Sequence, residues 1–188
     1  MNRSHNFQDD LTFSREIRDT YLVRFYGKYS SDGRYVFVDR SHCSDIIQKH
    51  LHVDTIMQRS NGTSTCIEEK AERRFTGNLA LETESCTVPG HESEGWMKTG
   101  KADLLLYCFP DGTDAVQAYV MDFQELKAWF WTIDWTYREY TMPHNNRTRM
   151  RLVPLTDIGN AVGWSRYHIT RFDAICTDRR ERNVQWAS

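Results

Sequence analysis

Three side chains near the middle of the chain have the types and spacing of a hydrolytic metal site. Asp54 lies before the polar segment RSNGT (59–63), and Glu68 and Lys70 lie after it. Side chains two residues apart in a strand share a face, so Glu68 and Lys70 point the same way and Glu69 points the other way. Carboxylate oxygens suit Mg²⁺, and a lysine beside the metal can orient a water for attack on a phosphodiester. We therefore predict Asp54 and Glu68 as metal ligands and Lys70 as the residue that positions the water.

The alternative is a solvated strand face that carries an ordinary cross-strand ion pair, worth about 0.2–1 kcal/mol. Charged residues make up 27% of the chain, so an aspartate followed by Glu-x-Lys also arises by chance. The context favours the site. Its acids fall on predicted strands joined by a turn, and Glu68 follows the apolar Ile67 in a strand whose other face we expect to be buried. A predicted helix precedes the hairpin, and further strands follow it.

A β-hairpin is the element that must bring these residues together. VDTIMQ (53–58) and STCIEEK (64–70) have strand composition, and Asn61-Gly62 between them favours the positive φ angles of a tight turn. Such a turn folds the strand that carries Asp54 back against the strand that carries Glu68.

The remaining pattern predicts an α/β fold with a mixed central sheet flanked by helices. Phe13, Ile17, Tyr21 and Phe25 recur every four residues, which indicates a helix over 13–26 that Gly27 is placed to end. Apolar runs and alternation predict strands at 34–39, 78–84, 102–109, 117–122 and 151–155, helices at 44–50, at 123–131 and after 156 or 157, and a loop or short irregular helix at 85–100. We expect one domain over 1–188, with its core at about 13–158, an extension at 159–188 and frayed final residues.

Composition excludes several classes of protein. Apolar residues make up 39% of the 188, which is too many for a disordered chain, and no stretch approaches the roughly 20 apolar residues of a membrane span. The first ten residues lack an apolar run, so we expect no signal peptide and a cytoplasmic location. Five cysteines without a CxxC pair fit a reducing compartment. The net charge of −2 leaves nucleic-acid binding to local clusters.

The hairpin and the segments after it resemble the PD-(D/E)XK nuclease superfamily, which includes restriction enzymes, phage exonucleases and Holliday-junction resolvases. More narrowly, the chain is similar to a group of uncharacterised phage-type nucleases. The resemblance covers roughly residues 50–125. It is carried by Glu68-Glu69-Lys70, Phe75-Thr76-Gly77-Asn78, Leu81-Glu82-Thr83-Glu84 and Lys101-Ala102-Asp103-Leu104.

The resemblance implies a restriction-endonuclease-like αβββαβ core, a DNA substrate and a Mg²⁺ or Mn²⁺ cofactor. It also implies that Asp54 and Glu68 ligate the metal and that Lys70 positions the nucleophilic water. Val53 stands where the family often has proline, and the spacing from Asp54 to Glu68 is long. Some members also use a glutamate of the first helix, which makes Glu16 a candidate. Glu82 on the later strand is a second additional candidate.

Residues 138–151 form the most basic stretch of the chain. The planar guanidinium of arginine matches the geometry of a phosphate, so we predict DNA contacts here. A solvated loop before a strand is an alternative of equal weight. The arginines concerned are Arg138, Arg147, Arg149 and Arg151. Nearby, Trp129, Trp131 and Trp135 suit core packing or a hydrophobic docking patch before they suit base stacking. An exposed tryptophan would favour a partner or self-association, and a homodimer is possible on this ground.

The first functional hypothesis is a metal-dependent nuclease that hydrolyses DNA, on branched or end structures, in the host cytoplasm if the chain is phage-derived. The second is a nuclease-fold protein without catalysis that binds nucleic acid or protein. A converging carboxylate pocket favours the enzyme. A metal-free basic loop together with a solvent-facing Glu68–Lys70 pair favours the binding module.

Overall fold

The structure is a computed structural model that describes residues 7–31, 33, 37–39, 51–142 and 147–180. Its main sheet has seven strands in the order β1-β2-β3-β6-β7-β10-β11. All neighbours pair antiparallel except β3 and β6, which run parallel. The prediction of an α/β fold with a mixed sheet is confirmed. The strands of this sheet are β1 (Phe37–Asp39), β2 (Thr55–Gln58), β3 (Ser64–Ala71), β6 (Leu104–Pro110), β7 (Ala115–Asp122), β10 (Trp164–Thr170) and β11 (Ala174–Arg180).

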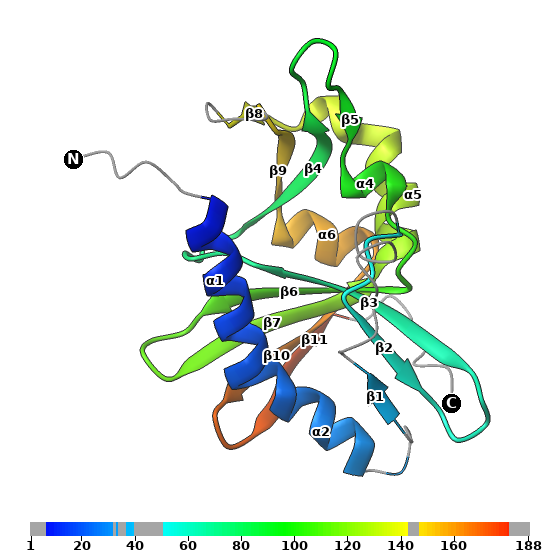
Figure 1. Ribbon diagram of the computed structural model, residues 1–188, viewed down its shortest axis with the longest axis vertical. Helices are drawn as coiled ribbons and strands as arrows, with labels where there is room; N and C mark the ends of the chain where they lie inside the picture. Colours follow the sequence, from blue (N-terminus) through cyan, green and yellow to red (C-terminus); the bar gives the residue numbers. More distant parts are fainter. Residues whose placement is uncertain (1–6, 32, 34–36, 40–50, 143–146, 181–188) are drawn as a thin grey trace.

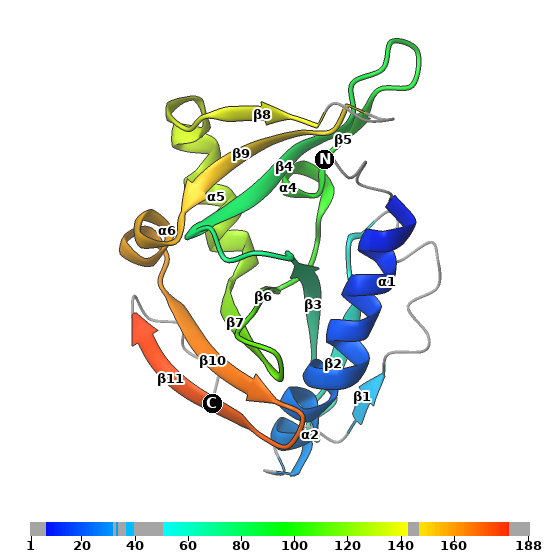
Figure 2. The same cartoon turned by 90° about the vertical axis from the view of Figure 1, so that its left-hand side faces the viewer.

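A continuous helical segment covers one face of this sheet (Figures 1 and 2). It consists of α1 (Phe7–Ile17), the π-helical turn η1 (Arg18–Leu22) and α2 (Val23–Ser31). The adjacent pairs Tyr21-Leu22 and Phe25-Tyr26 are buried along this segment. The predicted stripe is confirmed: Ile17, Tyr21 and Phe25 are buried, and Phe13 packs beside them. The predicted end at Gly27 is wrong, because α2 continues through it to Ser31.

The opposite face of the main sheet packs against a second, antiparallel sheet in the order β5-β4-β9-β8 (Figure 2). The strand predicted at 78–84 is present, but it belongs to this second sheet and does not continue the hairpin. Its N-terminal half buries Leu79 and Leu81 against the main sheet. The strands of the second sheet are β4 (Asn78–Cys86), β5 (Ser93–Glu94), β8 (Glu139–Thr141) and β9 (Arg149–Pro154).

Three helices complete this second layer. The predicted helix at 123–131 is α5 (Phe123–Ile133), which begins where the Asp122 side chain accepts a hydrogen bond from the Glu125 backbone N–H at 2.7 Å. It ends in the 3₁₀ turn η2 (Asp134–Thr136). The predicted loop at 85–100 contains β5 and the short helix α4, and the helix expected after 156 or 157 starts slightly earlier. These two helices are α4 (Trp96–Thr99) and α6 (Leu155–Ala161).

The side chains of β6 alternate between the two layers that cover the main sheet. Leu104, Leu106 and Cys108 pack toward α1 and α2, whereas the alternate residues Leu105, Tyr107 and Phe109 pack toward the second sheet. A strand buried on both faces reads as a continuous apolar run, which is why 102–109 stood out in the sequence.

The C-terminal part of the chain belongs to the main sheet. Residues 159–188 were expected to extend beyond the core, yet β10 pairs with β7 and β11 pairs with β10. Tyr167 and Ile169 of β10 are buried in the same core as α1 and α2. The helix predicted at 44–50 and the final residues 181–188 lie outside the described residues.

Candidate metal centre

The hairpin brings Asp54 and Glu68 together as predicted. Thr55 pairs with Ile67 in the antiparallel register of β2 and β3, and the side chain of Asp54, the residue before Thr55, shares a hydrogen bond with Glu68. The Asp54 backbone N–H donates to the Ile67 carbonyl at 2.8 Å, and the Glu69 backbone N–H donates to Asp54 Oδ2 at 2.8 Å. The first hydrogen bond holds the Asp54 backbone against β3, and the second holds its carboxylate there.

Glu68 is almost completely buried, with 2% of its surface exposed. Burial raises the pKa of Glu68 to about 7. Lys70 opposes this shift, and the nearby Asp54 carboxylate, which shares a hydrogen bond with Glu68, adds to it. Two acids held this close repel each other when both are ionised, and a proton or a cation between them relieves the repulsion.

Lys70 lies beside the two acids, on the same strand face as Glu68. Its ammonium forms an ion pair with the Glu68 carboxylate and lies 5.3 Å from the centroid of the Trp96 ring. About a third of the Lys70 side chain remains exposed. Burial alone would lower the pKa of Lys70, but the charges of Glu68, Asp54 and Glu82 outweigh it and raise that pKa. Lys70 is therefore a cation at neutral pH.

The additional glutamates fall in different places. Glu82 on β4 contributes to the field at Lys70, and its carboxylate accepts a hydrogen bond from the Ser85 hydroxyl. Glu16 is exposed on α1. Arg18, two residues further along, is the helical residue that reaches the acids.

Arg18 and Glu69 form a second charged group that the sequence analysis did not assign to the site. Arg18 Nε donates to Glu69 Oε2 at 2.7 Å, and a terminal nitrogen of Arg18 lies 3.3 Å from Asp54 Oδ1. The other Glu69 oxygen accepts hydrogen bonds from the Tyr26 and Thr55 hydroxyls, both at 2.6 Å. This group ties the helical layer to the hairpin at the level of Asp54. In the sequence, the four-residue spacing of Arg18, Leu22 and Tyr26 indicates that Arg18 and Tyr26 share one face of a helix.

The donor set of Asp54 and Glu68 fits a hard divalent cation. Mg²⁺ is commonly held by one or two carboxylates together with waters and substrate phosphates. Within the described ranges, no three His, Cys, Asp or Glu side chains are grouped to hold a metal ion. The two carboxylates therefore suit a site that is completed by water and substrate, and they do not suit a closed structural site.

Two of the four arginines predicted to contact DNA are already ion-paired with acids of the protein. Arg149 pairs with Glu84 at 2.9 Å and with Glu139 at 3.4 Å, and Arg151 pairs with Glu139 at 3.0 Å. These are cross-strand pairs of the second sheet, and β4 supplies Glu84 as a second acid beside the arginines. The two remaining arginines of this prediction, Arg138 and Arg147, are exposed.

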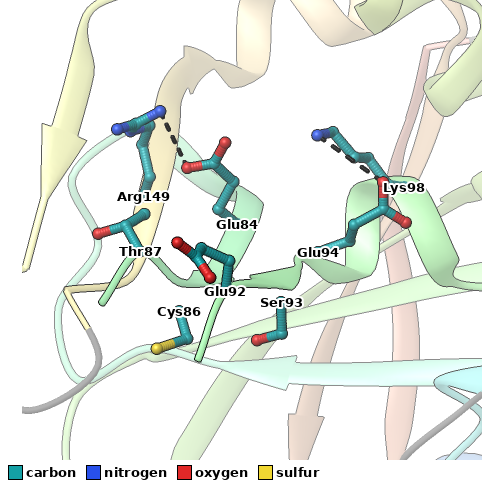
Figure 3. Close-up of a pocket in the computed structure, with 8 residues that line it drawn as sticks. All are labelled: Glu84, Cys86, Thr87, Glu92, Ser93, Glu94, Lys98 and Arg149. Carbon is teal, nitrogen blue, oxygen red and sulfur yellow. Dashed lines mark ion pairs between the residues drawn. The ribbon is translucent and has the colours of Figure 1, made fainter. Parts of the chain in front are cut away.

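A pocket of about 330 Å³ lies away from these carboxylates, at the end of the second sheet (Figure 3). Two ion pairs lie in its wall: Glu84 with Arg149 at 2.9 Å, and Glu94 with Lys98 at 4.0 Å. The pocket does not contain Asp54, Glu68 or Lys70, so the chemistry predicted from the sequence is not assigned to it. Its lining residues are Glu84, Cys86, Thr87, Glu92, Ser93, Glu94, Lys98 and Arg149.

Comparisons with protein families, curated proteins and solved structures found no match to this chain. None of the described helices combines the length and the apolar character that crossing a bilayer requires.

Proposed function

We propose that the protein is a metal-dependent nuclease that hydrolyses DNA phosphodiester bonds, with Mg²⁺ or Mn²⁺ held by Asp54 and Glu68. The observation that carries the proposal is the meeting of Asp54, Glu68 and Lys70 at one end of the hairpin, with Glu68 buried. A solvent-facing Glu68–Lys70 pair would have favoured a scaffold without catalysis, and Glu68 does not face solvent.

Each side chain has a separate task in this proposal. Asp54 and Glu68 supply hard oxygen ligands, and the Glu69 N–H keeps Asp54 in place. The Lys70 ammonium holds the attacking water and offsets negative charge that develops on the phosphate. Trp96 covers one side of that ammonium and limits its contact with bulk water. When bound, the metal supplies Lewis-acid stabilisation of charge on the phosphodiester.

One observation favours the second candidate, a nuclease-fold protein that binds nucleic acid or protein without catalysis. The Arg18 guanidinium lies 3.3 Å from Asp54 Oδ1 and partly neutralises the carboxylate that a cation would need. The two candidates differ in divalent-metal binding. A cytoplasmic location, a phage setting and a homodimer remain predictions.

Paired substitutions separate the candidates. Glu68→Ala should abolish both Mn²⁺ binding, measured by calorimetry, and cleavage of plasmid and oligonucleotide DNA with Mg²⁺ or Mn²⁺. Lys70→Ala should retain metal binding and lose about 10²–10⁴-fold in cleavage rate, because a positioned catalytic group contributes that much. Asp114→Ala removes an exposed acid from the turn between β6 and β7 and is the matched control with unchanged activity.

Two results would contradict the proposal. A well-folded wild-type protein that binds no divalent metal and cuts no DNA form would favour the non-catalytic candidate. Full cleavage by Lys70→Ala would leave a nuclease but remove Lys70 from the mechanism.

A further inference from the structure

Two exposed tryptophans and a lysine lie on α5 and the 3₁₀ turn that follows it. Lys127 and Trp131 are spaced four residues apart, which places them on the same face of α5, and Trp135 follows in η2. Trp131 is 37% exposed and Trp135 is 65% exposed. The Trp131 indole N–H donates to the Met97 carbonyl at 3.1 Å, so this ring is held in a fixed orientation against α4.

Three lysines lie on α4, just beyond it and on α5. The Lys98 ammonium lies 5.8 Å from the centroid of the Trp131 ring, and Lys101 is exposed just beyond α4. The Lys127 ammonium donates to the carbonyls of Lys98 at 3.2 Å and Gly100 at 2.6 Å. Burial lowers the pKa of Lys127, and the positive charge of Lys101 lowers it further. Glu94 lies 4.0 Å from Lys98 and backbone carbonyls hold the Lys127 ammonium, so a phosphate contact is best tested at the exposed Lys101.

The same short helix links this surface to the candidate metal centre. Trp96, the first residue of α4, lies beneath the Lys70 ammonium, and Lys98 lies two residues further on. The Lys101 N–H donates to the Leu51 carbonyl at 2.8 Å, three residues before Asp54. α4 therefore contacts both Lys70 of the candidate metal centre, through Trp96, and the Trp131 ring, through Lys98.

We propose that Lys98, Lys101, Lys127, Trp131 and Trp135 form a binding surface for single-stranded DNA. Aromatic side chains with lysines beside them match unpaired bases and their phosphates, whereas the bases of a duplex are already stacked on one another. The inference rests on the proposed nuclease function, because it names the form of DNA that this site receives. It also gives the exposed tryptophans a stacking role, where the sequence favoured core packing or docking.

Binding is tested without cleavage. Fluorescein-labelled oligothymidylate of about 20 nucleotides is titrated with the full chain in EDTA, and a duplex of equal length is titrated in parallel. We expect the single strand to bind more tightly and to quench tryptophan fluorescence. Trp135→Ala should weaken binding about 5- to 150-fold, because stacking on one aromatic side chain contributes that much. Lys101→Ala should reduce the slope of log affinity against log salt by about 0.7.

Matched controls come from the turn between β10 and β11. Phe172→Ala removes an aromatic ring that is 90% exposed, and Arg171→Ala removes an exposed cation. Both should leave binding unchanged.

The possible outcomes separate the two proposals. Single-strand binding that depends on Trp135 and Lys101 in a protein that never cleaves DNA would support the surface and refute the nuclease. Cleavage that is indifferent to both substitutions would refute the surface and retain the nuclease. A change of oligomeric state in Trp135→Ala, seen by light scattering and without a change in DNA affinity, would overturn the surface in favour of protein docking.

Discussion

Folding buries the Glu68 carboxyl group, and burial disfavours its ionised form. Its pKa rises from an ordinary value of 4.5 to about 7, chiefly because the group is buried. Between about pH 4.5 and pH 7, Glu68 is protonated in the folded protein and ionised in the unfolded chain. The stability of the protein therefore falls as pH rises through this range. A shift of this size corresponds to about 3 kcal/mol.

Replacing the acid by its amide should remove this pH dependence. In EDTA, we expect Glu68→Gln to lose less stability than the wild type between about pH 4.5 and pH 7, by up to about 3 kcal/mol. Urea denaturation at several pH values measures the difference. Parallel curves for the two proteins would show that Glu68 does not titrate in this range.

At the scale of the element, α2 differs from its prediction at Gly27. This residue lies inside the helix, has no positive φ, and has nothing within 4 Å of the position of an added Cβ. Gly27→Ala should stabilise the protein by about 0.5–1 kcal/mol, because glycine is a poor residue within a helix. Chemical denaturation measures the change.

Gly112 is the matched control for Gly27. It has equally open surroundings but a φ of +72°. Gly112→Ala should destabilise the protein by about 1 kcal/mol, since an L side chain is strained at that angle. A destabilised Gly27→Ala would indicate that α2 ends where the sequence suggested.

The arginines of β9 and the arginines beside them should respond differently to substitution. Arg149 joins Glu84 and Glu139 across the second sheet, so Arg149→Ala should lower stability by about 1 kcal/mol. Arg138 and Arg147 are exposed, and their joint replacement by alanine should leave stability unchanged. If this pair contacts duplex phosphates, its loss should reduce the salt slope by about 0.9 per contact. An unchanged slope would make this stretch a solvated loop.

At the scale of the whole molecule, the main sheet requires the C-terminal strands. Burial of side chains such as Trp164, Tyr167 and Ile169 contributes about 1.5–3 kcal/mol each, and their loss is comparable with the stability of a typical domain. A chain that ends at residue 158 should therefore fail to unfold cooperatively, as measured by circular dichroism with urea. A chain that ends at residue 180 keeps every described strand and should unfold cooperatively. Cooperative unfolding of the shorter chain would make 159–188 a true extension.

Local sequence patterns determined the hairpin, the first helix and the buried central strand. The turn at Asn61-Gly62 and the alternation around it predicted the hairpin, and the hairpin brings the Asp54 side chain beside Glu68. The helix stripe at Ile17, Tyr21 and Phe25 and the buried run 102–109 were equally readable. These features depend on residues that are neighbours in sequence or across one tight turn, so their physical causes lie within the pattern itself.

Tertiary structure decided what joins distant parts of the chain. Which sheet receives the strand at 78–84, and whether β10 completes the main sheet, depends on long-range pairing that no local period encodes. Arg18 meets Asp54 and Glu69 because the N-terminal helical segment packs against the hairpin, which lies more than 30 residues further along the chain. Arg149 was a free cation in the sequence and became an ion-paired one because β4 placed Glu84 beside it. Burial of Glu68, on which its pKa depends, likewise arises only when the two layers close over the hairpin.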